Sequence, residues 1–233
     1  MYTCNLHIYF AGHPSHALDV IKKMPSFEHF THIFTESDEA EASLSQKADA
    51  IIADLSHLDV RSALQVFLTN RGSGTQIILL ADKKQMQLLC SDPVLKDVTD
   101  IWVMPMSDEE LRFRFLRWQQ TYKMSKDFWE TSHFLETTIN NIPSLVWYKD
   151  KEGVHEKVND SFCQAVNKTK EQVQGRRHAY IWDVAEDDPA CIESEHQVMS
   201  TEQTLLSEET IKAGEETRTP MCYKTPLHNC NTT

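Results

Sequence analysis

Residues 48–54 read ADAIIAD, and LSHLD at 55–59 breaks this apolar run at once. A short run of small and β-branched apolar residues predicts a strand that is buried on both faces, as in the interior of a parallel sheet. Asp54 is the last residue of the run. The stretch therefore predicts a buried strand that places one carboxylate at the edge of a sheet, where it could accept a phosphoryl group.

Four other apolar runs surround this strand, and segments with helical spacing separate them. We expect strands at 5–11, 29–35, 48–54, 75–81 and 100–104, with helices at 15–24, from Ser37 and Asp38 through 46, near 58–69, and at 83–89. Five strands that alternate with helices predict a parallel sheet covered on both faces. Asp54 would lie at the carboxyl edge of this sheet, where reactive groups gather in such folds.

Three features of this region support a resemblance to a known family: the order of the elements, Asp54 after the third strand, and Pro105 with SDEEL after the fifth. Residues 5–120 resemble the receiver domain of bacterial response regulators. The resemblance implies an α/β doubly wound, flavodoxin-like fold for a domain over 1–120. It also implies that Asp54 occupies the phosphoacceptor position.

Phosphoryl transfer to a carboxylate brings several negative charges together, so it requires Mg²⁺ and cationic support. Receivers supply acids after the first strand, a Thr or Ser after the fourth, and a Lys before the proline. The corresponding residues here are Ala11, Gly12 and His13; Leu80 and Ala81; and Met104. We therefore expect Asp54 to be vestigial and to accept hydrogen bonds in its turn. The alternative is a phosphorylatable receiver that uses Asp54.

Residues 107–140 contain neither proline nor glycine, and SDEE at 107–110 is a helix start with acids in its first turn. A long helix is expected, and its part over 121–140 would connect two domains. Its apolar side chains follow two neighbouring stripes: Leu111, Phe115, Trp118, Tyr122 and Trp129, then Phe128, Leu135, Ile139 and Ile142. An apolar seam beyond the first domain favours a parallel homodimer.

Residues 144–176 predict two strands joined by a turn over 150–153, followed by a helix that Asp160 and Ser161 open. The Asp-x-x-Gly turn, Asn159, Phe162 and Gly175 resemble the PAS fold, an α+β fold. A helix at 191–203 and strands at 205–214 and 217–229 would follow. The usual last strand is missing from this sequence, so we expect a C-terminally truncated PAS domain over 141–233, in an incomplete gene product.

A PAS pocket would be lined by side chains able to enclose an apolar or planar ligand. The candidates are Val146, Trp147, Asn159, Phe162, Cys163, Val166, His178, Tyr180 and Trp182. The same residues could simply fill the core, and Asn159 could simply fix a turn through backbone hydrogen bonds. We do not expect haem on His178, because a single His among aromatic residues is more often a hydrogen-bonded core residue. Cys163 lacks the motif for flavin photochemistry, so the cofactor stays unknown.

Composition excludes several classes of function. A net charge of −12 without a cluster of Lys or Arg argues against nucleic acid as a partner. No apolar run approaches the roughly 20 residues that span a bilayer, so we expect a cytoplasmic protein without a membrane partner. Six cysteines without a C-x-x-C pair predict reduced thiols and no metal site.

A receiver-like domain and a PAS domain joined by a helix resemble the input half of bacterial signalling proteins. Two segments resemble those signalling proteins whose next module is a GGDEF diguanylate cyclase, which makes cyclic di-GMP. They are VNKTKEQVQGRRHAYIWDV at 166–184 and YKTPL at 223–227. The resemblance implies a sensory input module that regulates this C-terminal output domain. None of the cyclase's residues lies in these 233 positions, so we expect no catalytic activity here. The alternative output is a histidine kinase.

Overall fold

The structure is a computed structural model that describes residues 4–27, 30–209, 211–213, 216–219 and 221–228. Two compact units make up the chain, residues 1–127 and 128–233, and each is described by itself. Among the described helices, none has an apolar stretch long enough to cross a membrane.

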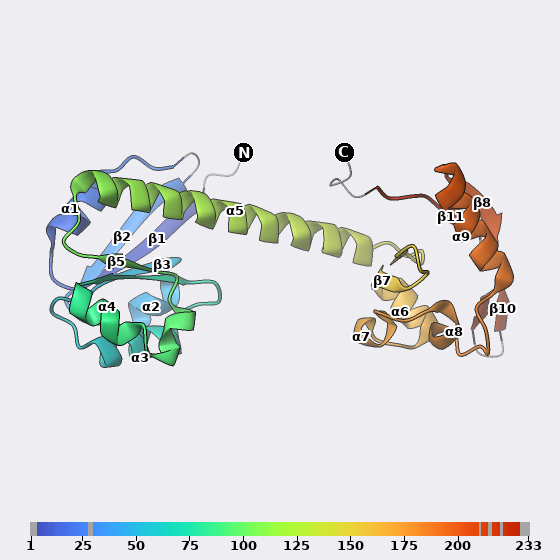
Figure 1. The fold of residues 1–233 in the computed structure, drawn as a ribbon, viewed down its shortest axis with the longest axis horizontal. Helices are drawn as coiled ribbons and strands as arrows, with labels where there is room; N and C mark the ends of the chain where they lie inside the picture. Colours follow the sequence, from blue (N-terminus) through green and yellow to red (C-terminus); the bar gives the residue numbers. More distant parts are fainter. Residues whose placement is uncertain (1–3, 28–29, 210, 214–215, 220, 229–233) are drawn as a thin grey trace. The chain divides into compact units, whose positions relative to one another are not determined.

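A five-stranded parallel sheet forms the centre of the first unit (Figure 1). Its strands are β1 (Cys4–Ala11), β2 (Phe30–Ser37), β3 (Ala50–Asp54), β4 (Gln76–Ala81) and β5 (Asp100–Val103). They lie in the order β2-β1-β3-β4-β5, which is the flavodoxin-like order. The predicted doubly wound fold is therefore confirmed.

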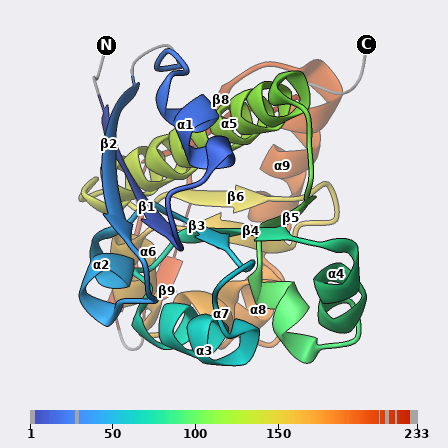
Figure 2. The ribbon, with the colours of Figure 1, turned by 90° about the vertical axis from the view of Figure 1, so that its left-hand side faces the viewer.

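Helices cover both faces of this sheet, as Figure 2 shows. α1 (His16–Lys22) and α5 (Asp108–Asn140) pack on one face, and α2 (Ala42–Lys47), α3 (Val60–Asn70) and α4 (Lys83–Leu89) pack on the other. A 3-10 turn, η1 (Pro93–Asp97), precedes β5. Side chains alternate along β1: Ile8 and Phe10 belong to the core under α1 and α5, whereas Tyr9 belongs to the core under α2 and α3.

The predicted start of the second helix at Ser37 and Asp38 is wrong. β2 continues to Ser37, which pairs with Ala11 of β1, and α2 begins only at Ala42. The Ser37 hydroxyl donates to Glu41 Oε1 at 2.5 Å, so this side chain serves the loop rather than a helix start. Pairing in the sheet therefore outweighs the local helix-start signal at Ser37. His29, the first residue of the predicted second strand, lies outside the described residues.

The long helix α5 begins and ends within one residue of its predicted bounds. Ser107 Oγ accepts a hydrogen bond from the backbone N–H of Glu110 at 3.2 Å, so Ser107 caps the helix. In the first half, Leu111, Phe115 and Trp118 are buried against the sheet. Beyond residue 122 the large apolar side chains of α5 are exposed; they are Met124, Phe128, Trp129, Phe134, Leu135 and Ile139.

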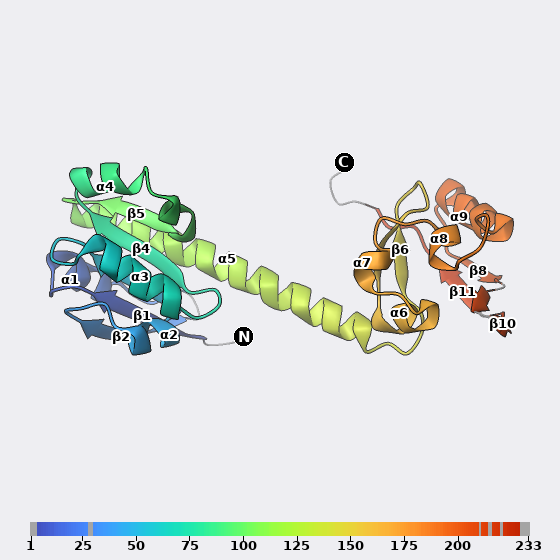
Figure 3. The ribbon, with the colours of Figure 1, turned by 90° about the horizontal axis from the view of Figure 1, so that it is seen from below.

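The second unit begins with the predicted hairpin. β6 (Trp147–Lys149) and β7 (His155–Val158) pair antiparallel, and Asp150 Oδ1 accepts from the backbone N–H groups of Glu152 and Val154 in the turn between them. Four helices follow: α6 (Asp160–Val166), α7 (Lys170–Val173), α8 (His178–Ile181) and α9 (Pro189–Thr201), all visible in Figure 3. An apolar core formed by β7, α6, α7 and α8 contains Val158, Phe162, Val166, Val173 and Ile181.

The last part of the chain is more divided than the sequence predicted. Each of the two expected strands is interrupted, which gives β8 (Leu205–Glu208), β9 (Ile211–Ala213), β10 (Glu216–Arg218) and β11 (Met221–Lys224). β8 pairs with β11, and β9 pairs with β10. Thr210, Gly214, Pro220 and Asn229 of the predicted strands lie outside the described residues. Within the described part, β6–β7 and β8–β11 are separate two-stranded sheets, and α9 packs on the second of them.

Candidate functional site

Asp54 is the last residue of β3, at the carboxyl edge of the first unit's sheet. Its Oδ1 accepts a hydrogen bond from the backbone N–H of Ser56 at 3.0 Å and from the Ser56 hydroxyl at 2.5 Å. This is the turn-forming role that the sequence predicted. No ion pair between Asp54 and any other described residue is present.

The residues after β1 offer Asp54 no acidic companion. Gly12 has φ +128°, and a Cβ at this position would lie 3.0 Å from both Cβ and the carbonyl oxygen of Asp54. A side chain at position 12 would therefore clash with β3. Beside it, His13 Nδ1 lies 3.2 Å from Asp38 Oδ1, and the His13 ring lies 4.8 Å from the ring of His57. Gly12 and His13 thus supply no carboxylate beside Asp54.

The side chains that follow β4 and β5 also make contacts that do not involve Asp54. Asp82 follows β4, and its Oδ1 accepts from the backbone N–H groups of Lys84 and Gln85 as the cap of α4. Met104 follows β5 and packs against the apolar core under α5. Within the described ranges, no group of three or more His, Cys, Asp or Glu side chains is placed to hold a metal ion.

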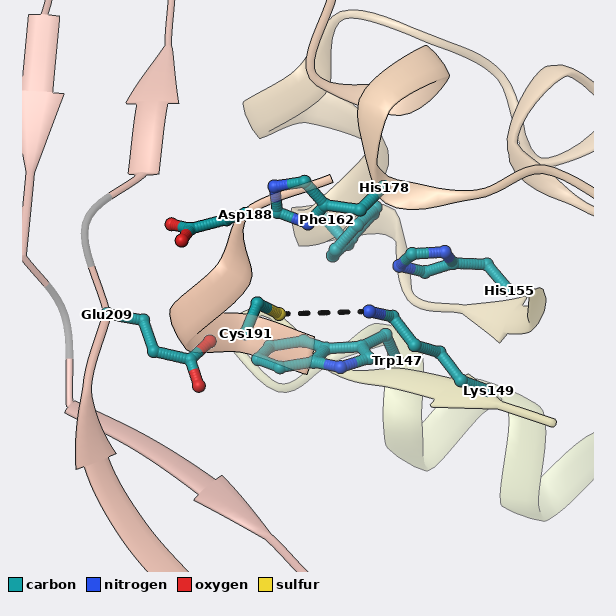
Figure 4. A pocket seen from close by; sticks show the side chains of 8 residues that line it. All are labelled: Trp147, Lys149, His155, Phe162, His178, Asp188, Cys191 and Glu209. Carbon is teal, nitrogen blue, oxygen red and sulfur yellow. Dashed lines mark hydrogen bonds between the residues drawn. The ribbon is translucent and has the colours of Figure 1, made fainter. Parts of the chain in front are cut away.

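The second unit contains a small cavity, shown in Figure 4. Its walls combine two aromatic rings with titratable side chains; the lining residues are Trp147, Lys149, His155, Phe162, His178, Asp188, Cys191 and Glu209. The space for the centres of water-sized molecules is about 20 Å³. A single water needs about 10–15 Å³ on this measure, so the cavity is far too small for haem or flavin as it stands.

Two ion pairs lie beside the cavity, one partly buried and one buried. Lys149 Nζ, on β6, lies 2.5 Å from Glu195 Oε1 on α9, and Lys224 Nζ, on β11, lies 2.5 Å from Glu209 Oε1. Lys224 also donates to Ser194 Oγ at 2.7 Å, and the two pairs approach each other where Lys224 Nζ lies 3.7 Å from Glu195. Because Lys149 belongs to β6 and Lys224 to β11, this network connects the two separate sheets through α9.

Burial sets the protonation of the side chains around the cavity. Burial raises the pKa of the Cys191 thiol to about 12, so Cys191 is a neutral thiol that donates to Glu195 Oε1 at 3.3 Å. Burial, together with the nearby Lys149 charge, lowers the pKa of His155 to about 4. Burial also lowers the pKa of His178. Both imidazoles are therefore neutral at pH 7.

The two ring nitrogens of His155 differ in their hydrogen bonding. Its Nδ1 lies 3.2 Å from the carbonyl oxygen of Arg176. Because a carbonyl can only accept, Nδ1 carries the proton, and Nε2 of the neutral ring is an acceptor. Within the described residues, Gln119 Nε2 is the buried side-chain polar atom without a hydrogen-bond partner; Nε2 of His155, a residue that is 1% exposed, is not such an atom. Figure 4 shows its ring directed toward the cavity.

Asn159 is fully buried and joins three segments. Its Oδ1 accepts from the backbone N–H groups of Val146 and Phe162, each at 3.0 Å. Its Nδ2 donates to the carbonyl oxygens of Ile139, Ile142 and Ser144, at 3.2, 3.1 and 2.9 Å. The structure therefore confirms that Asn159 fixes the turn before α6, and it adds that the same amide caps the end of α5.

Only some of the predicted pocket residues line the cavity. Trp147, Phe162 and His178 line the cavity, whereas Cys163, Val166 and Trp182 pack in the core. Tyr180 is half-exposed, with the Arg176 guanidinium 5.0 Å from its ring centroid. Val146 contributes a backbone N–H to Asn159.

Sequence reasoning missed Lys149, His155, Asp188, Cys191 and Glu209, which also line the cavity. Strand alternation could have found Lys149, since it lies two residues after Trp147 and so shares its face. For Cys191 and Glu209, no local pattern in the sequence indicates a position at the cavity.

No family model matches the chain, and no curated protein matches it. Several solved structures show partial likeness. The PAS domain of BvgS from Bordetella pertussis is 19% identical over 43% of this chain and 76% of its own, with a TM-score of 0.34. A CheY-like response regulator receiver domain protein from Methanospirillum hungatei JF-1 is 18% identical over 50% of this chain and 96% of its own, with a TM-score of 0.38.

An adenylate cyclase from Rhodopirellula baltica is 12% identical over 56% of this chain and 98% of its own, with a TM-score of 0.43. At such low identities and TM-scores these likenesses carry no information about function. The function proposed below rests on the residues of the chain itself.

Proposed function

We propose that the chain is the sensory and signal-transduction input module of a larger signalling protein. Its receiver-like unit would act by contact rather than by phosphotransfer, and its PAS-like unit would be the sensor. α5 would carry the signal. The module itself would have no catalytic activity, and its site of action would be the bacterial cytoplasm.

The main observation in support of this proposal is that α5 contacts the core of the first unit at one end and is bound by Asn159 of the second unit at the other. Leu111, Phe115 and Trp118 anchor its first half in the core of the first unit. Its last turn is held by Asn159 in the second unit. A continuous helix that is anchored in each unit can transmit a displacement from one anchor to the other, which is the mechanical requirement for an input module.

The same helix supports a homodimer. Met124, Phe128, Phe134 and Leu135 are each more than half exposed in the single chain, at 72%, 76%, 68% and 53%. Phe128 and Leu135 are seven residues apart, so they occupy equivalent positions of a heptad. A second copy of the chain, packed in parallel along residues 121–140 and extending to the PAS-like unit, would bury this seam.

Analytical ultracentrifugation over a wide range of concentrations tests the dimer. We expect the weight-average mass to rise toward that of two chains as the concentration increases. A mass that stays at one chain up to the highest soluble concentration would contradict the dimer and leave the seam unexplained.

For the output, we favour a C-terminal GGDEF diguanylate cyclase because of the resemblance of residues 166–184 and 223–227. A histidine kinase is the second candidate, since the same inputs and helix would serve it equally well. The coding sequence after codon 233 decides between them. A GGDEF-containing module there supports the first, a kinase module supports the second, and a stop codon at that point would contradict regulation of an output domain in the same chain.

A second candidate role for the first unit is a working phosphoacceptor at Asp54. The observation in its favour is the position of Asp54 at the carboxyl edge of β3, in a sheet with receiver topology. Against it stand Gly12, His13 and Met104 in place of the acids and the lysine.

A further inference from the structure

The exposed part of α5 that belongs to the second unit contains a seven-residue repeat. Phe128 and Leu135 are seven residues apart, and each is followed after three residues by a threonine, Thr131 and Thr138. This spacing places the four side chains on one stripe of the helix, at the a and d positions of two heptads. All four residues are exposed in the single chain. We call this set the heptad stripe; its large apolar residues alternate with threonines.

Two further apolar side chains flank the heptad stripe. Phe134 is at position g and Ile139 is at position e of the next heptad, and both are exposed, at 68% and 39%. In a parallel, in-register pair of helices, these two positions of opposite copies lie side by side. Phe134 of each copy would therefore contact Ile139 of the other. One heptad earlier the same rule pairs Asp127 with Ser132, so these flanking pairs bring no like charges together.

The order of residues along the heptad stripe favours a parallel pair over an antiparallel one. In a parallel, in-register pair, position a packs on a and position d packs on d. Phe128 then meets Phe128, Leu135 meets Leu135, and each threonine meets its own counterpart. In an antiparallel pair, position a packs on d, and the threonines would face Phe128 or Leu135. The parallel arrangement packs apolar surface on apolar surface, which is the more stabilising burial.

A threonine can enter such a layer without leaving its hydroxyl donor unpaired. Thr138 Oγ1 donates to the carbonyl oxygen of Phe134 at 2.7 Å, within its own helix. The hydroxyl therefore has an acceptor before any second copy approaches, and burial does not leave this donor unsatisfied. A polar layer is nevertheless weaker than an apolar one. In coiled coils, polar layers fix the register of the helices at a cost in stability.

We propose that residues 128–139 of two copies form a parallel, in-register coiled coil, in which Thr131 and Thr138 are polar layers that set the register. This inference rests on the proposed homodimer and gives its register and its contact residues. It places the PAS-like units of both copies at the same end of the paired helices. A monomer in ultracentrifugation would refute the homodimer and this inference together, whereas a dimer with other contacts would refute this inference alone.

Cysteine cross-linking of the full chain tests the register. Thr131→Cys places a thiol in a d layer, where the two copies of one position come close enough for a disulfide. We expect mild oxidation to join the two copies at position 131. Peptide mass spectrometry identifies the bridge, since the chain has six cysteines of its own. Thr137→Cys, off the stripe, is the matched control and should give no bridge at position 137. A dimer without the bridge at 131, or with equal bridging at 137, would overturn the proposal.

A second variant tests the polar layer itself. Thr131→Ile keeps a β-branched side chain and turns the layer apolar in both copies. We expect the dimer dissociation constant to fall about tenfold or more, because each copy then buries additional apolar surface. Thr137→Ile makes the same change off the stripe and should leave the constant nearly unchanged. Ultracentrifugation measures both. An unchanged constant in Thr131→Ile, or an equal fall in the two variants, would overturn the proposal.

Discussion

Asn159 Nδ2 lies 3.2 Å from the carbonyl oxygen of Ile139, in the last turn of α5. The same side chain accepts from the backbone N–H of Phe162, whose ring lines the cavity. A single buried amide therefore connects the wall of the cavity to the end of the helix that we propose as the signal carrier. A shift of the backbone at Phe162 would therefore disturb the hydrogen bonds that Asn159 makes at the end of α5.

Asn159→Ala should loosen this junction. The substitution removes a partner from two backbone N–H groups and three carbonyl oxygens, of which those of Ile139 and Ile142 keep a second donor. We predict a loss of about 3 kcal/mol of local stability. Hydrogen exchange of the amides in residues 136–166 measures it. Asn141→Ala is the control, because exposed Asn141 donates only to the carbonyl of Thr137. Equal exchange in the two variants would show that the Asn159 junction is not needed.

Lys224→Met should destabilise the second unit strongly. It leaves the carboxylate of Glu209, which is 8% exposed, without a cation. Breaking a buried pair on one side costs about 3–5 kcal/mol. Urea unfolding followed by tryptophan fluorescence measures the loss. Adding Glu209→Gln should recover part of it, since the unpaired charge is then removed, and exposed Lys157→Met should change little. A double variant no more stable than Lys224→Met would argue against a charge effect.

Acid should destabilise the second unit in two steps. The pKa of His155 is about 4 in the folded state and about 6.5 in an unfolded chain. Between these values only the unfolded chain binds the proton, so stability falls by about 3 kcal/mol as the pH drops from 6.5 to 4.

Glu209 adds the second, more acidic step. Burial alone would raise its pKa, but the hydrogen bond and charge of Lys224 and the Ser194 hydroxyl lower it overall. The stability it contributes is present above the unfolded-state pKa and is lost as the pH falls through its lower folded-state pKa. Unfolding free energies of the parent and His155→Phe at several pH values test the assignment. His155→Phe should flatten the slope above pH 4 without abolishing it, because the pKa of His178 is also lowered. Parallel slopes would contradict the role given to His155.

Leu135→Glu should weaken self-association of the chain. Leu135 lies in the exposed apolar seam of α5, and a carboxylate there would face its own copy across a parallel dimer. We predict at least a tenfold rise in the dimer dissociation constant, corresponding to about 1.4 kcal/mol or more. Thr137→Glu places the same charge two residues away, off the seam, and should leave the constant nearly unchanged. Equal effects of the two substitutions would mean that the copies meet elsewhere.

Much of the first unit could be predicted because its strands are short apolar runs with clear breaks. Ile51 and Ile52 are both fully buried, as a strand covered on two faces requires. The error at Ser37 arose where a helix-start signal and a strand edge fall on the same residue. Pairing with Ala11 in β1 decides between them, and no window of local sequence contains that partner.

The cavity could be predicted only in part. Asn159 is recognisable because its role is local: it accepts from an N–H three residues ahead. Cys191 and Glu209 come to the cavity only because α9 packs on β8 and β11. The pairing of Lys149 with Glu195 spans 46 residues, and nothing in the local pattern of either segment indicates it.

The claim on which the account depends most is that Asp54 accepts turn hydrogen bonds and no phosphoryl group. Incubation of the chain with Mg²⁺ and acetyl phosphate, followed by intact mass spectrometry, tests it most directly. We predict an unchanged mass, because the residues after β1, β4 and β5 supply neither the acids, nor the Ser or Thr hydroxyl, nor the ammonium that would hold the metal and the donor. A gain of one phosphoryl group that is absent in Asp54→Ala would contradict the account.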